Sequence, residues 1–126
     1  MANTFKVVNF AAEPNASGTP YVIYTAASST TTVVLGLILT NLHTAQVTTI
    51  VRLVSDTADR AGPLVSGAAA VDNQTSLLVK DAPIPVGGSL EILTGSKVVL
   101  ETTDQLTVDC SVADKLSGTL SVMEIT

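Results

Sequence analysis

The sequence predicts an all-β chain that folds as a two-sheet antiparallel β-sandwich, jelly-roll-like or immunoglobulin-like, of about 8–9 strands. The 126 residues include 17 valines and 18 threonines, whose branched side chains suit a pleated sheet better than a helix. Short stretches that alternate between apolar and polar residues recur along the chain, and turn residues separate them. The length fits one domain, residues 1–126, with a core that needs no disulfide or metal.

Two strands are predicted near the N-terminus, Phe5–Phe10 and Tyr21–Ala26, with the polar loop AEPNASGTP between them. Residues 1–20 could also form an N-terminal arm that reaches onto a neighbouring molecule. All the aromatic residues of the chain lie in these two strands, where packing in the core explains them. A platform for sugars or bases needs exposed rings, so a sugar-binding role has little support. These aromatic residues are Phe5, Phe10, Tyr21 and Tyr24.

The strongest strand prediction is Thr31–Asn41. Val33, Leu35, Leu37 and Leu39 share one face, and the other face is also largely apolar. This pattern is typical of a central strand that is covered on both sides. Val47–Ser55 follows a short turn, NLHTA, so we expect it to pair with Thr31–Asn41 as a hairpin.

The segment Asp56–Thr75 differs from the rest, because alanine and glycine replace the branched residues and the alternation disappears. A loop of about 20 residues is unusual in a compact domain and is often functional. It is either an interaction loop or a tolerated surface insertion, and a short helical turn is possible near residues 66–71.

Strands resume after this loop, with short turn-like connections between them. Pro83 and Pro85 cannot donate to a sheet ladder, so they indicate an edge or a link between sheets. Gly87-Gly88 is expected at a positive φ or a close backbone approach. Gly95-Ser96-Lys97 lacks the spacing of a phosphate loop and is predicted to be a hairpin turn. The predicted strands are Ser76–Lys80, Ser89–Leu93, Lys97–Glu101, Gln105–Val112 and Thr119–Ile125.

The charge and composition narrow the classes of partner. The net charge is −5 and the six basic residues are scattered, which argues against binding to nucleic acid or to anionic lipid. Only 13% of residues are charged while 46% are hydrophobic. This balance favours a protein that buries part of its surface against copies of itself or a larger assembly, or else a well-packed sandwich with a neutral surface. The apolar stretch Val33–Leu39 is far too short to span a bilayer.

Histidine and cysteine, which often serve as catalytic or metal-binding residues, occur once each. His43 lies in the turn NLHTA with no frame that would supply an orienting partner and a nucleophile, so it is interpreted as a surface turn histidine. Cys110 is the only cysteine, which excludes an intrachain disulfide and a standard zinc site. It alternates with Leu106 and Val108, so we expect a buried, inert thiol.

The acidic residues do not form a recognisable site in the sequence. Asp56, Asp59 and Asp72 flank or lie in the long loop, but the D-x-D-x-D-G spacing of a calcium loop is absent. Glu91 and Glu101 are expected to point to solvent from alternating strands. We therefore predict no catalytic, cofactor-binding or metal site, no cofactor, and no enzymatic activity.

The segments VVLGLILTNLHTAQVTTIVRLV, LLVKDAPIPVGGSLEIL, KVVLETTDQLTV and SGTLSVMEIT resemble a group of small virion structural proteins of tailed bacteriophages. In that group a G-L-x-L-x-N strand precedes a T-x-x-V strand, followed by an A-P-I-P-x-G-x-S-L crossing, a K-V-V-L-E strand and an L-S-V-x-E-I-T ending. The resemblance covers residues 31–126, and the long loop at Asp56–Thr75 departs from it. The corresponding residues here are Gly36–Asn41, Thr48–Val51, Ala82–Leu90, Lys97–Glu101 and Leu120–Thr126.

The resemblance implies a β-sandwich that assembles with other virion proteins. It does not decide between the capsid surface, the head–tail neck and the tail. The leading hypothesis, motivated also by the low-charge composition and by residues 1–20, is a capsid decoration (cement) protein, made in the host cytoplasm, that forms a homo-oligomer (a trimer) and contacts the major capsid protein. A tail, baseplate or neck component is the nearest alternative. A receptor- or carbohydrate-binding module with Asp56–Thr75 as its recognition loop is the other. We expect partner choice to reside in residues 1–20 and in this loop.

Overall fold

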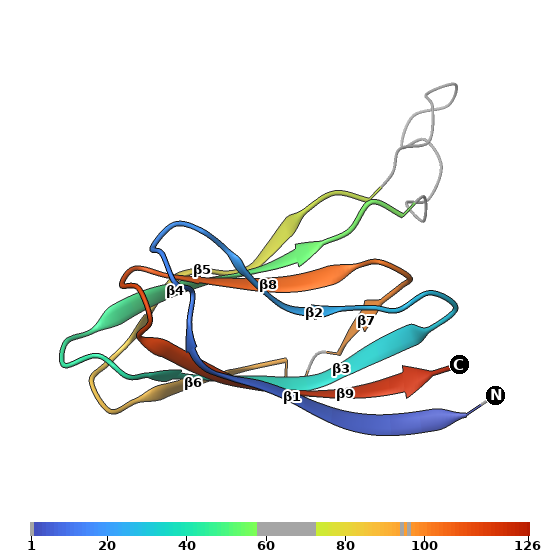
Figure 1. The fold of residues 1–126 in the computed structure, drawn as a ribbon, viewed down its shortest axis with the longest axis horizontal. Coiled ribbons are helices and arrows are strands. Elements are labelled where there is room, and N and C mark those ends of the chain that lie inside the picture. The colour runs from blue at the N-terminus through green and yellow to red at the C-terminus, as the bar shows by residue number, and fades with distance from the viewer. Residues whose placement is uncertain (1, 58–72, 94, 96) are drawn as a thin grey trace.

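The computed structural model describes residues 2–57, 73–93, 95 and 97–126, and all its regular structure is β-sheet. Two antiparallel sheets face each other across one core (Figure 1), so the predicted all-β, two-sheet sandwich is confirmed. The strands are β1 (Asn3–Glu13), β2 (Tyr21–Thr25), β3 (Thr31–Asn41), β4 (Val47–Val54), β5 (Ser76–Ile84), β6 (Ser89–Ile92), β7 (Val98–Leu100), β8 (Gln105–Cys110) and β9 (Leu116–Ile125).

Sheet A has the strand order β1-β9-β3-β6, with β7 also paired to β3, and sheet B has the order β2-β8-β4-β5. The first and last strands of the chain are therefore neighbours. Their ends are joined by backbone hydrogen bonds between Ala2 and Thr126, one in each direction, and Figure 1 shows the two termini side by side.

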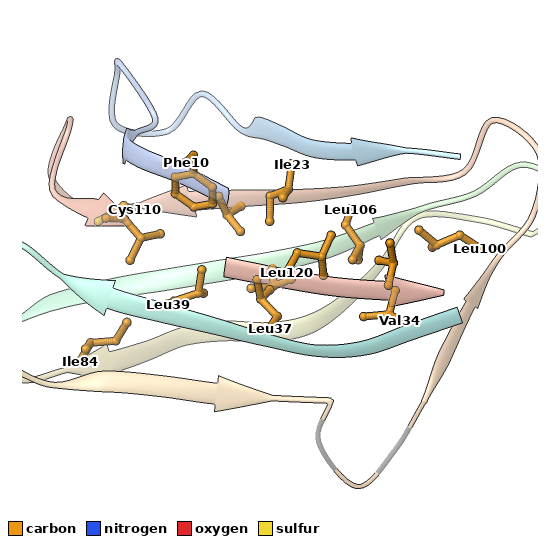
Figure 2. Packing of buried hydrophobic residues seen from close by; sticks show 14 of the residues in the cluster. Phe10, Ile23, Val34, Leu37, Leu39, Ile84, Leu100, Leu106, Cys110 and Leu120 are labelled. Carbon is orange, nitrogen blue, oxygen red and sulfur yellow. The ribbon is translucent and has the colours of Figure 1, made fainter. Parts of the chain in front are cut away.

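The core fills the space between the sheets (Figure 2). Val34, Leu37 and Leu120 from sheet A and Leu106 and Val108 from sheet B are fully buried. Burying one such side chain contributes about 1.5–3 kcal/mol relative to leaving it exposed. Their period-two spacing explains why each strand turns these residues to the inside.

A close contact between Phe10 and Gly118 fastens β1 to β9. The two residues are partners across the ladder, and a Cβ atom on Gly118 would lie 2.5 Å from Phe10 Cζ and 3.1 Å from Leu39 Cδ2. The Phe10 ring therefore packs directly on the glycine backbone. The same ring meets Tyr21 of sheet B at a centroid distance of 5.2 Å.

The predicted hairpin between Thr31–Asn41 and Val47–Ser55 is wrong. β3 lies in sheet A and β4 lies in sheet B, so the turn between them crosses from one sheet to the other. Asn41 stabilises this crossing, because its buried side chain donates hydrogen bonds to the carbonyls of Ala45 (2.9 Å), Ile84 (2.9 Å) and Pro85 (3.2 Å). One side chain thus joins the β3–β4 and β5–β6 crossings.

The prediction of a hairpin turn at Gly95-Ser96-Lys97 is also wrong. β6 pairs with Leu37–Thr40 and β7 pairs with Thr32–Val34, both antiparallel to β3. The two short strands therefore follow one another along the same edge of sheet A instead of pairing with each other. Residues 94 and 96 of this segment lie outside the described residues.

The region predicted as a possible N-terminal arm, residues 1–20, consists largely of a strand. Residues 3–13 form an eleven-residue edge strand paired with β9, because the apolar side chains of Val8 and Phe10 complete the core. Most of the long loop predicted at Asp56–Thr75, with its helical turn near residues 66–71, lies outside the described residues.

Several local predictions are confirmed. Pro83 lies in β5, an edge strand, and the chain crosses between the sheets just after it. Gly87 has a φ of 72°, and a Cβ on Gly88 would lie 2.9 Å from Pro85 Cγ. The Cys110 thiol is buried, with 2% of the residue exposed.

Candidate interaction surface

A row of apolar side chains crosses the outer face of sheet A, on the side away from the core. Phe5 of β1 is opposite Met123 of β9, Met123 is opposite Val33 of β3, and Val33 is opposite Val99 of β7. Partners across an antiparallel ladder share a face of the sheet, and their chain neighbours Val34 and Val122 point into the core. We call the outward side chains of these strands the sheet A face.

Several large apolar side chains of the sheet A face are exposed to solvent. Phe5 is 71% exposed, Val7 64%, Val99 52% and Ile38 42%, and Met123 is half-buried among them. Large exposed apolar patches on a soluble domain mark interaction sites more often than isolated exposed residues do. Around this centre lie small polar residues, Asn3, Asn9, Thr31, Thr40, Ser117, Thr119 and Ser121.

The charge on this face is low. Among the outward strand residues of sheet A, which are all described, Glu91 of β6 is the one charged side chain. Lys97 precedes β7 at the same edge and donates a hydrogen bond from Nζ to the Leu35 carbonyl (3.3 Å). The net charge of −5 is therefore carried largely by other parts of the surface.

A shallow hollow of about 290 Å³ lies within the sheet A face, beside the exposed row. It forms where the register of β3 shifts between Val34 and Gly36. Gly36 has no side chain and its partner Ser121 has a small one, so the surface drops at this point. Ile38, Thr119 and Glu91 line the remaining sides.

The outer face of sheet B is more polar. Asp109 is 7% exposed, and its Oδ1 accepts hydrogen bonds from the backbone N–H groups of Gly18 (3.1 Å) and Cys110 (2.8 Å). Arg52 lies opposite Thr107, which is 4% exposed. A hollow of about 190 Å³ adjoins Asp109, but its polar groups serve to hold the 14–20 loop against β8.

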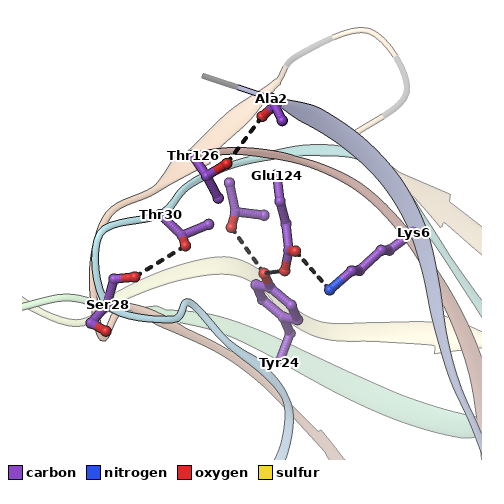
Figure 3. A network of polar contacts seen from close by, with 8 residues as sticks. Ala2, Lys6, Tyr24, Ser28, Thr30, Glu124 and Thr126 are labelled. Atoms are coloured by element: carbon purple, nitrogen blue, oxygen red, sulfur yellow. Dashed lines mark hydrogen bonds and ion pairs between the residues drawn. The ribbon is translucent and has the colours of Figure 1, made fainter.

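A polar cluster joins the two sheets beneath the sheet A face (Figure 3). Glu124 of β9 pairs with Lys6 of β1 at 2.8 Å and accepts a hydrogen bond from the hydroxyl of Tyr24, which comes from β2 in sheet B. The Tyr24 hydroxyl also lies 2.9 Å from Thr32 Oγ1. Each group thus has a partner, and the cluster closes the sandwich where apolar packing ends.

The pKa values in this cluster follow from those contacts. The hydrogen bond from Lys6, and then that from Tyr24, lower the pKa of the Glu124 carboxyl. Burial, and then the hydrogen bond to Glu124, raise the pKa of the Tyr24 hydroxyl. Both shifts favour a charged Glu124 beside a neutral Tyr24, which is a stabilising arrangement for the fold.

The residues weighed as reactive groups are spread over the molecule. His43 lies half-buried in the β3–β4 turn, where its backbone N–H donates to Asn41 Oδ1 (2.7 Å). Asp56 and Glu91 are exposed, as predicted for Glu91, and Glu101 is half-buried. Asp59 and Asp72 lie outside the described residues. Within the described part of the chain, no group of three or more His, Cys, Asp or Glu could hold a metal ion.

Sequence reasoning missed the sheet A face. Phe5 was predicted to lie in the core, but its outward position leaves it largely exposed. The same holds for Ile38, on a strand predicted to be covered on both sides. The sequence did contain a signal, because a strand that is apolar on both faces, as Thr31–Asn41 is, needs a second covering layer. In the described structure no second layer covers it.

Comparisons with known proteins agree with the fold. No family model and no curated protein matches the chain. A solved structure of infectious bursal disease virus strain Gx is 14% identical, and the VP2 subviral particle of that virus is 13% identical, each with a TM-score of 0.50 over 96% of this chain. The chain spans 32% of those viral chains. A chain of the Bacillus endospore appendages, described as disulfide-linked pili, is 15% identical, with a TM-score of 0.44 over 99% of this chain and 87% of the other.

At these identities the likeness concerns the fold alone. The bacteriophage resemblance of residues 31–126 therefore stays a prediction. No helix in the described part of the chain is long and apolar enough to cross a membrane.

Proposed function

We propose that this chain is a non-enzymatic structural protein of a bacteriophage virion. Its role is that of a capsid decoration (cement) protein, made in the host cytoplasm and then bound to the major capsid protein of the head. It acts as a homo-oligomer. Decoration proteins of this broad class suggest a trimer, whereas the shape and charge of the sheet A face favour a pair. The observation that supports this role best is the sheet A face, an exposed surface with an apolar centre and few charges.

The physical argument rests on burial. Apolar surface contributes about 25 cal/mol per Å² when it is removed from water, although association offsets part of this gain. A decoration protein repeats its contact many times over a shell, so a modest gain per copy adds up. The hydrogen-bonded ladders that join β1, β9, β3 and β7 hold these side chains together on one surface, as such a contact needs.

Two further observations agree with a structural role. The segments that resemble phage virion proteins are those that form the strands of both sheets, β3 to β9, and so belong to the scaffold of the molecule. A virus particle protein shares this fold at a TM-score of 0.50. The polar clusters at Glu124 and Asp109 are satisfied internally and serve to hold elements of the fold together.

The test is to purify particles of the virus whose genome encodes this chain. Quantitative mass spectrometry should find the protein in many copies per particle, and an image reconstruction should place it on the outside of the head. Particles without the protein should release their DNA at a lower temperature than wild-type particles. Density at the tail or neck would show that the protein is a component of that part of the virion and not a capsid decoration protein. Absence of the protein from particles would refute the proposal.

A further inference from the structure

We propose that the sheet A face is a self-association surface, on which two copies of this chain pack face to face about a two-fold axis. In this arrangement Phe5 of each copy enters the hollow beside Gly36 of the other. The inference rests on the proposed assembly role and names one partner for it, a second copy of the chain.

The area of the face is sufficient for a stable pair. Strands lie about 4.8 Å apart and rise about 3.4 Å per residue. A sheet four strands wide with strands of about ten residues therefore presents about 650 Å² per copy, or about 1,300 Å² for the pair. Specific interfaces bury about 1,200–2,000 Å² in total, so face-to-face packing of sheet A reaches the lower end of that range.

The distribution of charge favours a second copy over a charged partner. Two chains that each carry a net charge of −5 repel each other unless they meet where charge is low. The centre of the sheet A face, around Phe5, Val7 and Met123, consists of apolar residues with small polar residues around them. Its one charged strand residue, Glu91, lies on the edge strand β6 and lines the outer side of the hollow, so its carboxylate is placed at the rim of the contact, where water remains available.

The shape of the face is complementary to itself. A two-fold contact requires that whatever projects from one copy meets a recess on the same surface of the other. Phe5 is the most exposed of the large hydrophobic side chains described, and the hollow of about 290 Å³ lies between the next two strands of the sheet, beside Ser121 of β9 and Gly36 of β3. Aromatic anchors that enter pockets commonly carry most of the energy of an interface.

The experiment measures molar mass by sedimentation velocity over a wide range of concentrations. Wild-type protein should approach twice the 12.9 kDa mass of the chain. Phe5→Ala should weaken pairing by about 30-fold or more, as expected for an interface anchor. Val7→Glu places like charges in the interface and should weaken pairing by about 100-fold or more. Thr119→Lys, at the edge of the hollow, is a second probe of the same contact.

Val86→Glu is the matched control. Val86 is 58% exposed, similar to Val7, but it lies in the turn between β5 and β6, outside the strands that form the sheet A face. This variant should dimerise within about twofold of wild type, since surface changes outside an interface have small effects. Circular dichroism and urea unfolding of each variant show whether weaker pairing results from a lost contact or from unfolding of the protein.

The outcomes separate this inference from the proposed function. Monomeric wild-type protein at all concentrations, a trimer, or a dimer that survives Val7→Glu and Thr119→Lys would each overturn the face-to-face pairing. Each of these results is compatible with the presence of the protein in virions, which the purification of particles tests separately. Loss of pairing in the Phe5 and Val7 variants, with the Val86 variant unaffected, supports the face-to-face pairing.

Discussion

The contact between Phe10 and Gly118 allows the packing of this sandwich to be tested quantitatively. The perturbation is Gly118→Ala, made in the wild-type chain and in Phe10→Ala. In the wild type, the new methyl group would lie 2.5 Å from Phe10 Cζ and 3.1 Å from Leu39 Cδ2. Both neighbours belong to the core, so the ring must leave its position or the strands must separate.

The expected magnitudes follow from known core substitutions. Gly118→Ala alone should lower the free energy of unfolding by about 1–3 kcal/mol, the usual cost of overpacking. Phe10→Ala alone should lower it by about 3–5 kcal/mol, because it leaves a cavity. With Phe10 removed, the same glycine substitution should instead raise it by about 0.5–1 kcal/mol, since alanine restricts the unfolded chain and fills part of the cavity. The coupling energy is then about 1.5–4 kcal/mol.

The assay is equilibrium urea unfolding of the four proteins, with the free energies extrapolated to water. Leu100→Ala serves as the control partner for Gly118→Ala. Leu100 pairs with Thr32 and Gly118 with Leu39, seven residues apart along β3 or about 24 Å, so these two substitutions should be additive. An equal cost of Gly118→Ala with and without Phe10 would refute the reasoning.

Three further predictions concern polar groups and the thiol. Asn41→Ala should lower the free energy of unfolding by about 2–3 kcal/mol, because buried carbonyls at both crossings lose their donor; a loss below 0.5 kcal/mol in urea unfolding would contradict this role, since changes of that size are common at surfaces. The pKa of Glu124 is lowered in the fold, so its stabilisation is present above the unfolded-state pKa and is lost as the pH falls through the folded-state pKa. The melting temperature of wild type should therefore fall more steeply than that of Glu124→Gln in acid, and equal slopes would contradict the ion pair with Lys6. The Cys110 thiol should react with an aromatic disulfide reagent only at the rate of unfolding, whereas rapid labelling of native protein would show that it is accessible.

The strand pattern was predictable because it depends on local spacing. The segment Thr31–Asn41 alternates, and it forms a strand with the same bounds. Pro83 cannot donate to a ladder, and it lies on an edge strand. Gly87 and Gly88 stand where the backbone needs a positive φ and a close approach. Each of these features is decided by the residue itself and its immediate neighbours.

The interaction surface was not predictable in the same way. Phe5 and Phe10 lie on one strand at an odd spacing, so they must point to opposite faces, and only one of them can reach the core. The sequence does not say which, because Phe10 is selected by the glycine opposite it on β9, more than a hundred residues later. The role of Glu124 likewise depends on Tyr24, which lies a hundred residues away in the other sheet.

By itself the sequence determined an all-β chain, the approximate positions of its strands, the edge at Pro83 and the buried state of Cys110. Only the tertiary structure decided that β3 and β4 belong to different sheets, that β6 and β7 follow one edge of β3, and that the outer face of sheet A is largely apolar and is not covered by any described part of the chain. The reason is that alternation shows which side chains share a face of a strand. Which face meets the core, and which strand lies beside it, depends on packing between segments far apart in the chain.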